Sequence, residues 1–177
     1  EGCHVPKLLG CYEQPLWSTI EDAVQTSYKS IVHIGCAEGY YAVGMARRLP
    51  NTRVFAFDMN EQALTVCKRL AKLNNVETLF EFGTKFQHED FKNFEEEDVL
   101  IICDIEGGEG ELLDPTKAPS LAKMDLIVET HDLFQKGLLE QLISRFETTH
   151  QIKKIDDNGQ RYLPDLPAWF YRLPHLD

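Results

Sequence analysis

Residues 31–46, IVHIGCAEGYYAVGMA, decide the fold of this chain. A short apolar run of Ile31, Val32 and Ile34 breaks at Gly35, and apolar residues return at helical spacing from Tyr41 onward. The pattern predicts a buried strand, a tight turn and a helix. Small residues in such a turn let the backbone approach a ligand closely, and the helix N-terminus behind them presents unpaired N–H groups. We therefore expect a ligand over residues 35–39.

The turn leaves two ligand classes open, and a connection without any ligand is the third interpretation. Dinucleotide sites use G-x-G-x-x-G, whereas this turn reads GCAEG, with Ala37 at the second glycine position. Glu38 is expected to face the space of a pyrophosphate, where its carboxylate would repel phosphate. The turn is better suited to a ligand that is cationic at one end, such as the amino-acid part of S-adenosylmethionine.

Composition limits the class of protein and of partner. The chain has 177 residues, and we expect one domain, with residues 1–29 as an N-terminal helical cap segment and 30–177 as a cofactor-binding core. A formal charge of -11 disfavours nucleic acid and anionic membrane surfaces as partners. No apolar run approaches the roughly 18 residues of a membrane span, no signal-peptide pattern opens the chain, and the five cysteines are scattered. We expect a soluble, cytoplasmic protein with free thiols; its oligomeric state stays open.

Residues 53–57 form the second predicted strand, which ends at Asp58. Asp58 follows Gly39 by close to the roughly 20 residues at which an acidic group meets a ribose hydroxyl pair. The alternative is that Asp58 only caps the helix predicted for residues 60–73. Upstream, residues 1–13 are expected to be irregular and 15–27 helical, with Tyr12, Glu13 and Trp17 either packing or covering the cofactor pocket.

Residues 77–82 are predicted as a third strand, and the polar, acidic segment 83–97 as a loop. In a doubly wound sheet this loop would lie beside an adenine, so Asp90 or Glu89 could accept from its amino group and Phe91 could stack on its ring. A solvated acidic loop is the competing interpretation.

Two apolar runs, residues 98–103 and 125–129, are typical of central parallel strands buried on both faces. Ligands of open α/β sheets bind beyond the carboxyl ends of the strands. We therefore expect one cleft to receive the polar residues that follow both runs, namely Asp104, Glu106, Gly107, Glu109, Glu129, Thr130, His131 and Asp132. Residues 133–146 are predicted as a helix, and 151–156 and 168–173 as strands that close the sheet.

Four segments in order, IVHIGCAEGYYAVGMA, VFAFDMNEQAL, CDIEGGEGELL and LIVETH, resemble the class I S-adenosylmethionine-dependent methyltransferases, and within them the FkbM-type family. The D-x-E-G-x-E signature of that family stands here at residues 104–109. The resemblance implies an α/β, Rossmann-like, doubly wound fold: a mostly parallel seven-stranded sheet with helices on both faces and an antiparallel C-terminal edge. His33 departs from the family, since an acidic residue is usual at that strand position.

The resemblance implies S-adenosyl-L-methionine as cofactor, with the glycine turn at its methionine end and Asp58 at its ribose. Together with the reasoning above, the residues expected to bind it are Gly35, Cys36, Ala37, Glu38, Gly39, Asp58, Met59, Asp90, Phe91 and Asp104.

For methyl transfer to a hydroxyl, a base must take the acceptor proton, and His131 is the first candidate because imidazole titrates near neutrality. Asp104 and Glu106 could orient it or bind the acceptor, while the competing interpretation is a surface histidine. Asp104, His131 and Asp132 are also spaced like the ligands of metal-dependent O-methyltransferases, so magnesium or calcium is a further alternative. The FkbM signature requires no metal, and none is expected.

The sequence thus predicts a methyltransferase that acts on a hydroxyl of a small molecule. Two alternatives are a non-catalytic S-adenosylmethionine-binding module of a larger enzyme and a nicotinamide-dependent oxidoreductase. The acceptor itself cannot be identified from these residues.

Overall fold

The computed structural model describes residues 4–95, 98–131, 136–157 and 159. The chain divides into two compact units, one formed by Val24–Ile152 and the other by Glu1–Ala23 with Lys153–Asp177. Each unit is described by itself, and the single domain with a boundary near residue 29 stays a prediction.

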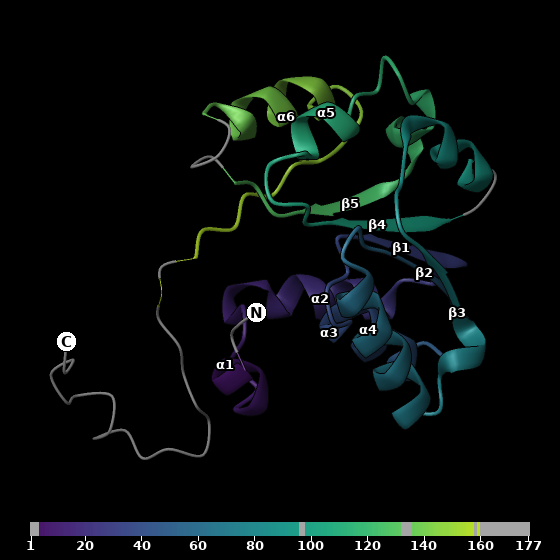
Figure 1. Ribbon diagram of the computed structural model, residues 1–177. Coiled ribbons are helices and arrows are strands. Elements are labelled where there is room, and N and C mark those ends of the chain that lie inside the picture. The colour runs from purple at the N-terminus through teal and green to yellow at the C-terminus, as the bar shows by residue number, and fades with distance from the viewer. Residues whose placement is uncertain (1–3, 96–97, 132–135, 158, 160–177) are drawn as a thin grey trace, which may run out of the picture. The chain divides into compact units, whose positions relative to one another are not determined.

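A parallel sheet organises the unit Val24–Ile152. Within the described residues it has five strands in the order β3-β2-β1-β4-β5, and every neighbouring pair is parallel (Figure 1). The strands are β1 (Ser30–Ile34), β2 (Arg53–Phe57), β3 (Phe80–Gly83), β4 (Val99–Cys103) and β5 (Asp125–Val128). The order reverses direction at β1 and β4, which confirms the doubly wound α/β fold.

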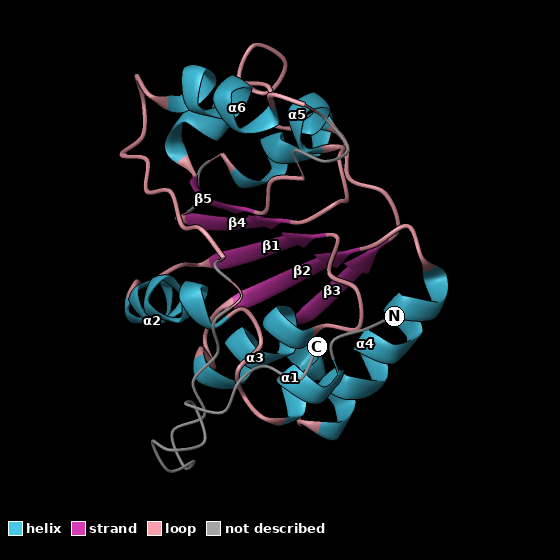
Figure 2. Ribbon diagram, turned by 90° about the vertical axis from the view of Figure 1, so that its left-hand side faces the viewer, coloured by secondary structure: helices cyan, strands magenta, loops and turns pink. Residues whose placement is uncertain are grey.

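Helices cover both faces of this sheet, as predicted. Figure 2 shows α3 (Tyr40–Arg48) and α4 (Glu61–Leu73) on one side and α5 (Glu109–Leu112) and α6 (Leu138–Phe146) on the other. The described residues of this unit also form the short 3₁₀ helices η2 (Glu77–Leu79), η3 (His88–Phe94) and η4 (Pro119–Lys123).

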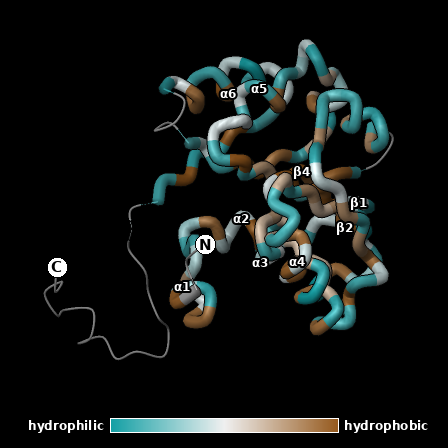
Figure 3. The backbone as a smooth tube through the Cα atoms, viewed as in Figure 1, coloured by the Kyte–Doolittle hydropathy of each residue, from teal (hydrophilic) through white to brown (hydrophobic). Residues whose placement is uncertain are grey.

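Two apolar clusters fix the layers because alternate side chains of each strand point to opposite faces. Val32, Phe55 and Ile101 pack in the cluster that contains Leu138 and Phe146 of α6. Val54 and Ala56 instead pack with residues of α3 and α4, among them Ala42, Val43, Leu64 and Cys67. Hydrophobic residues are correspondingly concentrated along the central strands in Figure 3.

The other unit contains α1 (His4–Leu8), η1 (Gln14–Leu16) and most of α2 (Trp17–Gln25). The helix predicted for residues 15–27 is therefore present, but the irregular segment predicted for 1–13 is wrong because α1 lies within it. Pro6 is compatible with α1 because the first turn of a helix tolerates proline. Trp17 donates from Nε1 to the Tyr12 carbonyl at 3.3 Å; a role of either residue over a cofactor stays a prediction.

The predicted closing strands are not confirmed. Residues 151–157 have no helix or strand, so the strand predicted for 151–156 is wrong. Ile152 and Ile155 are three residues apart and therefore could not share one face of a strand, where side chains repeat every two residues. The strand predicted for 168–173 lies outside the described residues, and the seven-stranded count and the antiparallel edge stay unconfirmed.

Within the loop predicted for 83–97, the described residues 83–95 are more regular and more buried than expected. They contain η3, and Phe86, Phe91 and Phe94 are buried there. Their rings pack edge-on with one another and with Phe55 and Phe57 of β2. Aromatic burial of this kind stabilises a fold by roughly 1.5–3 kcal/mol per side chain, which explains why the segment folds onto the sheet despite its acidic residues.

Two further boundaries differ from prediction. Residues 77–79 form η2, so the third strand begins only at Phe80. The helix predicted for 133–146 begins at Leu138, after Gly137 in a left-handed conformation, and residues 132–135 lie outside the described part. Among the described residues, no helix combines the length and the apolar character needed to cross a membrane.

Candidate functional site

The residues that follow the strands are joined into one edge of the sheet by backbone hydrogen bonds. The amide of Asp104 donates to the carbonyl of Ile34 at 3.0 Å, and that of Gly35 donates to Phe57 at 2.8 Å. The amide of Glu129 donates to Cys103 at 3.0 Å. Because all five strands are parallel, the loops after β1, β2, β4 and β5 therefore lie side by side.

The turn after β1 has a backbone that requires small residues. Gly35 has φ +80°, and a Cβ there would lie 1.6 Å from the carbonyl oxygen of Asp104. Gly39 has φ +92°, and a Cβ there would lie 2.5 Å from Cys67 Sγ. Ala37, at φ 46°, is also in the left-handed region. The glycines thus let the turn pass directly over the end of β4 and over α4.

Asp58 holds this turn from the neighbouring strand. Its Oδ2 accepts the amide of Ala37 at 2.7 Å, and its Oδ1 accepts the amide of Asn60 at 2.8 Å. The N-cap of α4 is Asn60, whose Oδ1 accepts from the amides of Gln62 and Ala63. The interpretation of Asp58 as a mere helix cap is therefore wrong. Each of its oxygens retains a second lone pair that could accept a ligand hydroxyl.

The other predicted cofactor residues differ in exposure. Cys36 is buried, and its hydrogen bond with Cys67, followed by burial, raises the pKa of the Cys36 thiol. Only the backbone of Cys36 is thus available to a ligand. Ala37 is exposed, Glu38 is half-buried, and Met59 is exposed by 79%.

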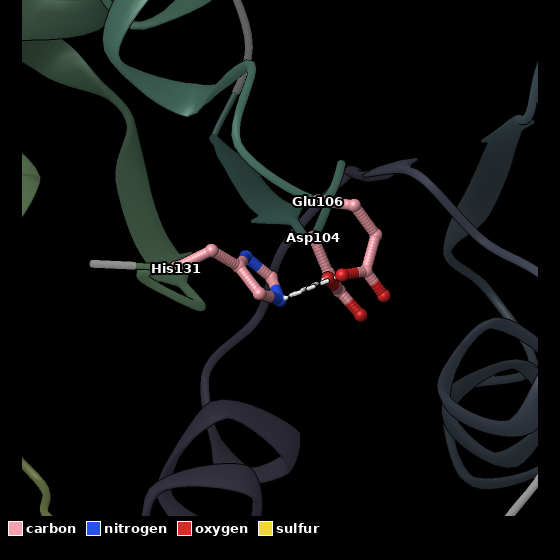
Figure 4. Close-up of side chains that lie close together, drawn as sticks. All are labelled: Asp104, Glu106 and His131. Atoms are coloured by element: carbon pink, nitrogen blue, oxygen red, sulfur yellow. Dashed lines mark ion pairs between the residues drawn. The ribbon is translucent and has the colours of Figure 1, made fainter. Parts of the chain in front are cut away.

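The predicted catalytic residues do come together. Nε2 of His131 lies 3.2 Å from Glu106 Oε2 and 3.6 Å from Asp104 Oδ1 (Figure 4). The ring Nδ1 lies 3.1 Å from Oε1 of Glu109, and Nε2 lies 3.8 Å from Glu129. The imidazole side chain is exposed by only 14%. A surface histidine is therefore excluded, because the ring stands among four carboxylates.

These carboxylates change the acidity of the imidazole. Burial alone lowers the pKa of His131, but the hydrogen bond and negative charge of Glu109, followed by the charges of Asp104 and Glu106, outweigh it and hold the pKa above the usual 6.5. A raised pKa makes the neutral imidazole a stronger base.

Sequence reasoning placed Glu109 in an open cleft, and this is wrong. Its side chain is fully buried at the first residue of α5, where it reaches His131 from inside the fold. The turn before it, with Glu106 at φ 57° and Gly107 at φ 107°, directs the chain back. The glycines of the IEGGEG stretch were the available signal for such a turn.

His33 stands where the resemblance leads us to expect an acidic residue, and it is buried beside α3. It is 4% exposed, and its ring meets that of Tyr41 on α3 edge-on at 6.4 Å between centroids. Its Nδ1 has no hydrogen-bond partner among the described residues. Burial lowers the pKa of His33 to about 4, so the ring is neutral at neutral pH.

Phe91 and Asp90, the residues predicted to contact an adenine, differ in exposure, and the contact of Asp90 with an adenine stays a prediction. Phe91 is fully buried against Phe86, so it offers no ring face for stacking. Asp90 accepts the amide of Gln87 at 2.7 Å and lines a pocket of about 300 Å³ with Phe57 and Phe86. That pocket also reaches Arg53 at the start of β2, so it runs along the sheet face and not over the glycine turn.

The acidic cluster around His131 contains side chains that could together bind a divalent cation. Asp104, Glu106 and His131 each offer a ligand atom, and these atoms lie within 4.8 Å of one another. Oxygen and imidazole donors of this kind suit several divalent ions. Asp132, the third ligand in the sequence-based alternative, lies outside the described residues.

Comparison with known proteins identifies the family. Residues 25–149 match the family model of the methyltransferase domain. The chain belongs to this family. It is 33% identical over 153 residues to the release factor glutamine methyltransferase of Flavobacterium psychrophilum, a match that covers 82% of this chain and 50% of the relative. The chain thus spans half the length of that curated relative.

Solved structures of methyltransferases share the fold. A candidate rRNA methylase from Clostridium thermocellum aligns with a TM-score of 0.65 and 14% identity, covering 85% of this chain and 90% of the other. The O-methyltransferase TomG from Streptomyces achromogenes, in complex with S-adenosylmethionine, aligns with a TM-score of 0.52 and 17% identity, covering 84% and 68%. Both support the Rossmann-like methyltransferase fold alone, and the FkbM-type subfamily stays a prediction.

Proposed function

We propose that this methyltransferase-domain protein is an enzyme that transfers the methyl group of S-adenosylmethionine to a hydroxyl of a small molecule. The observation that carries the proposal is the 2.7 Å hydrogen bond from the Ala37 amide to Asp58, at the same sheet edge as the His131 cluster. The turn that we propose binds the cofactor and the candidate base thus share one edge of the sheet.

The binding roles follow from which groups remain accessible. Asp58 has lone pairs left for the ribose hydroxyls while it holds the turn. The backbone of residues 35–39 and the half-buried Glu38 are suited to the cationic methionine end. Met59 and Asp90 remain candidates for contact with the adenine, and Asp104 for contact with the sulfonium. Phe91 is fully buried and is no longer a candidate.

The chain's own part in transfer is to hold the acceptor and to take its proton. S-adenosylmethionine, when bound, supplies the methyl group and its own leaving group. Neutral His131 would accept the hydroxyl proton at Nε2, and Asp104 and Glu106 would hold the acceptor through hydrogen bonds. Orienting the acceptor in this way can supply several kcal/mol of the barrier.

The expected acceptor is neutral or cationic. The formal charge of -11 and the four carboxylates around His131 disfavour nucleic acid and anionic membranes as partners. We also propose a cytoplasmic location.

A second candidate acceptor is a glutamine side chain of a protein. It is favoured by the 33% identity to the release factor glutamine methyltransferase. Parallel assays with labelled cofactor, one set with small hydroxyl compounds and one with a glutamine-containing release-factor peptide, distinguish the two candidates.

Calorimetry tests cofactor binding. Titration should show binding of S-adenosylmethionine and none of NAD, which would remove the oxidoreductase alternative. Asp58→Ala should weaken binding at least about 10-fold, equivalent to about 1.4 kcal/mol. Glu61→Gln, an exposed charge change at the start of α4, is the matched control and should bind as the parent does. Equal affinity of Asp58→Ala and the parent would sink the proposal.

Label transfer tests catalysis. His131→Gln should lower kcat by about 10²-fold or more, the usual contribution of a general base, while cofactor affinity is retained. Cofactor binding without transfer to any acceptor would instead favour the non-catalytic module.

A further inference from the structure

Glu109 is a buried carboxylate with an unusual set of donors. Its Oε1 accepts the amide of Ile105 at 3.0 Å, and its Oε2 accepts the amide of Gly107 at 3.0 Å. The third donor is the ring of His131, whose Nδ1 lies 3.1 Å from Oε1. A buried carboxylate is stable only when its oxygens are hydrogen-bonded in this way.

The bond to Glu109 determines which nitrogen of His131 carries a proton. Both oxygens of Glu109 already accept backbone N–H groups, so the carboxylate acts as an acceptor here and Nδ1 is the donor. In the neutral ring the remaining lone pair is then on Nε2. Nε2 is the nitrogen that faces Asp104 and Glu106, as Figure 4 shows.

The other carboxylates around the ring are less able to hold it. The side chain of Glu109 is 0% exposed, whereas those of Asp104, Glu129 and Glu106 are 35%, 50% and 73% exposed. The two most exposed of these carboxylates, those of Glu106 and Glu129, are solvated and weakly oriented. Glu109 contacts Nδ1, on the opposite side of the ring from the nitrogen that faces Asp104 and Glu106, so its hydrogen bond does not involve Nε2.

We propose that Glu109 is a positioning residue of the transfer site: its carboxylate fixes His131 as the Nδ1–H tautomer and aims Nε2 at the rim formed by Asp104 and Glu106. The inference rests on the proposed function, in which Nε2 takes the proton of the acceptor hydroxyl. Glu109 itself need not touch the cofactor or the acceptor.

A merely structural role would be to tie down residues 105–107. The two roles differ in what Glu109→Gln does. The side-chain amide introduced by this substitution can take two orientations. In one, its oxygen accepts the Ile105 amide while its NH₂ faces the Gly107 amide, donor against donor. In the other, its NH₂ faces both the Ile105 amide and Nδ1 of His131. Either way the negative charge behind the imidazole is lost, and the preference for a proton on Nδ1 weakens.

Nitrogen NMR of histidine labelled with ¹⁵N reads the tautomer directly, without any acceptor. The signals of His131 are assigned among the six histidines by their absence in His131→Gln. In the parent protein above the pKa of His131, we expect Nδ1 to carry the proton and Nε2 to be unprotonated. A parent protein with the proton on Nε2 overturns the inference, even if no Glu109 variant folds.

Kinetics provide the second measurement. Glu109→Gln should shift the tautomer signals toward a mixture and lower kcat about 10-fold or more, with the KM for S-adenosylmethionine within about twofold. The control Glu111→Gln removes an exposed carboxylate two residues along the chain and should change neither. Unchanged tautomer signals and unchanged kcat in Glu109→Gln contradict the role of Glu109. An Nδ1–H tautomer in a protein that transfers no methyl group would instead contradict only the proposed function.

Discussion

His33 links the burial of one side chain to the acid stability of the fold. Its pKa is about 4 in the folded state against 6.5 for an ordinary histidine, so between these pH values the unfolded chain binds more protons than the folded one. Stability should therefore fall as pH drops from 6.5 to 4, by about 3 kcal/mol from this residue.

Urea unfolding of the parent and of His33→Leu at pH 4, 5.5 and 6.5 checks this expectation. Leucine at the site has no proton to exchange, so the variant should lose about 3 kcal/mol less between pH 6.5 and 4, whatever its stability at pH 6.5. Parallel pH dependences of the two proteins would show that His33 titrates normally in the fold.

The protonation of His131 should determine how the rate of methyl transfer depends on pH. Its pKa is raised above 6.5, chiefly by Glu109 against the effect of burial, and only its neutral form can take a proton. The rate of transfer should therefore increase with pH through a pKa above 6.5 and level off beyond it. Glu106→Gln removes one of the charges that raise this pKa, so the acid limb of the profile should move to lower pH.

The matched control for that shift is Glu140→Gln, which removes an exposed carboxylate on α6. It should leave the acid limb in place. A profile that is flat between pH 6 and 8 in the parent would rule out His131 as the base.

At the scale of elements, the turn after β1 depends on Gly35. Alanine there would have to adopt φ +80° and place its Cβ 1.6 Å from the Asp104 carbonyl oxygen. Gly35→Ala should cost upward of about 4 kcal/mol, the range of severe steric substitutions, or prevent folding. Gly44, inside α3, has nothing within 4 Å of an added Cβ, so Gly44→Ala should stabilise by about 0.5–1 kcal/mol. Thermal unfolding compares the two, and equal stabilities would contradict the described turn.

At the start of α4, the helix-capping role of Asn60 can be tested separately from the ligand-binding role proposed for Asp58. Asn60 Oδ1 accepts two amides of the first turn, so Asn60→Ala should cost about 1 kcal/mol of stability. Cofactor affinity should be nearly retained, because the backbone amide that Asp58 binds remains. If calorimetry showed Asn60→Ala to bind S-adenosylmethionine as weakly as Asp58→Ala does, the capping role of Asn60 could not be separated from cofactor binding, and the assignment would be contradicted.

Local patterns predicted β1, β2 and the turn between β1 and α3 because each is specified by neighbouring residues. The burial of Phe91 and Glu109 could not be predicted in this way, since it depends on contacts with β2 and His131 that are distant in sequence. Conversely, residues 151–156 contain β-branched residues but no apolar face with period two, and the structure has no strand there.

For the whole unit Val24–Ile152, the parallel sheet explains why residues from separate segments lie at one edge. Each strand ends at the same edge, so an aspartate after β2, an aspartate after β4 and a histidine after β5 lie along it without being close in sequence. The strand order, more than any one motif, therefore brings Asp104 and His131 together.

Ligand binding at this edge should stabilise the fold as a unit, because a ligand that binds only the folded state shifts the unfolding equilibrium. At 100 times its Kd, S-adenosylmethionine should add about 2.7 kcal/mol, which for a chain of this length raises Tm by about 5–10 °C. Differential scanning fluorimetry measures the shift, with NAD at equal concentration as the control ligand and Asp58→Ala as the control protein. A comparable shift with NAD would favour the nicotinamide-dependent alternative. An undiminished shift in Asp58→Ala would mean that the ligand binds elsewhere, since the carboxylate of Asp58 holds the turn and is proposed to bind the ribose.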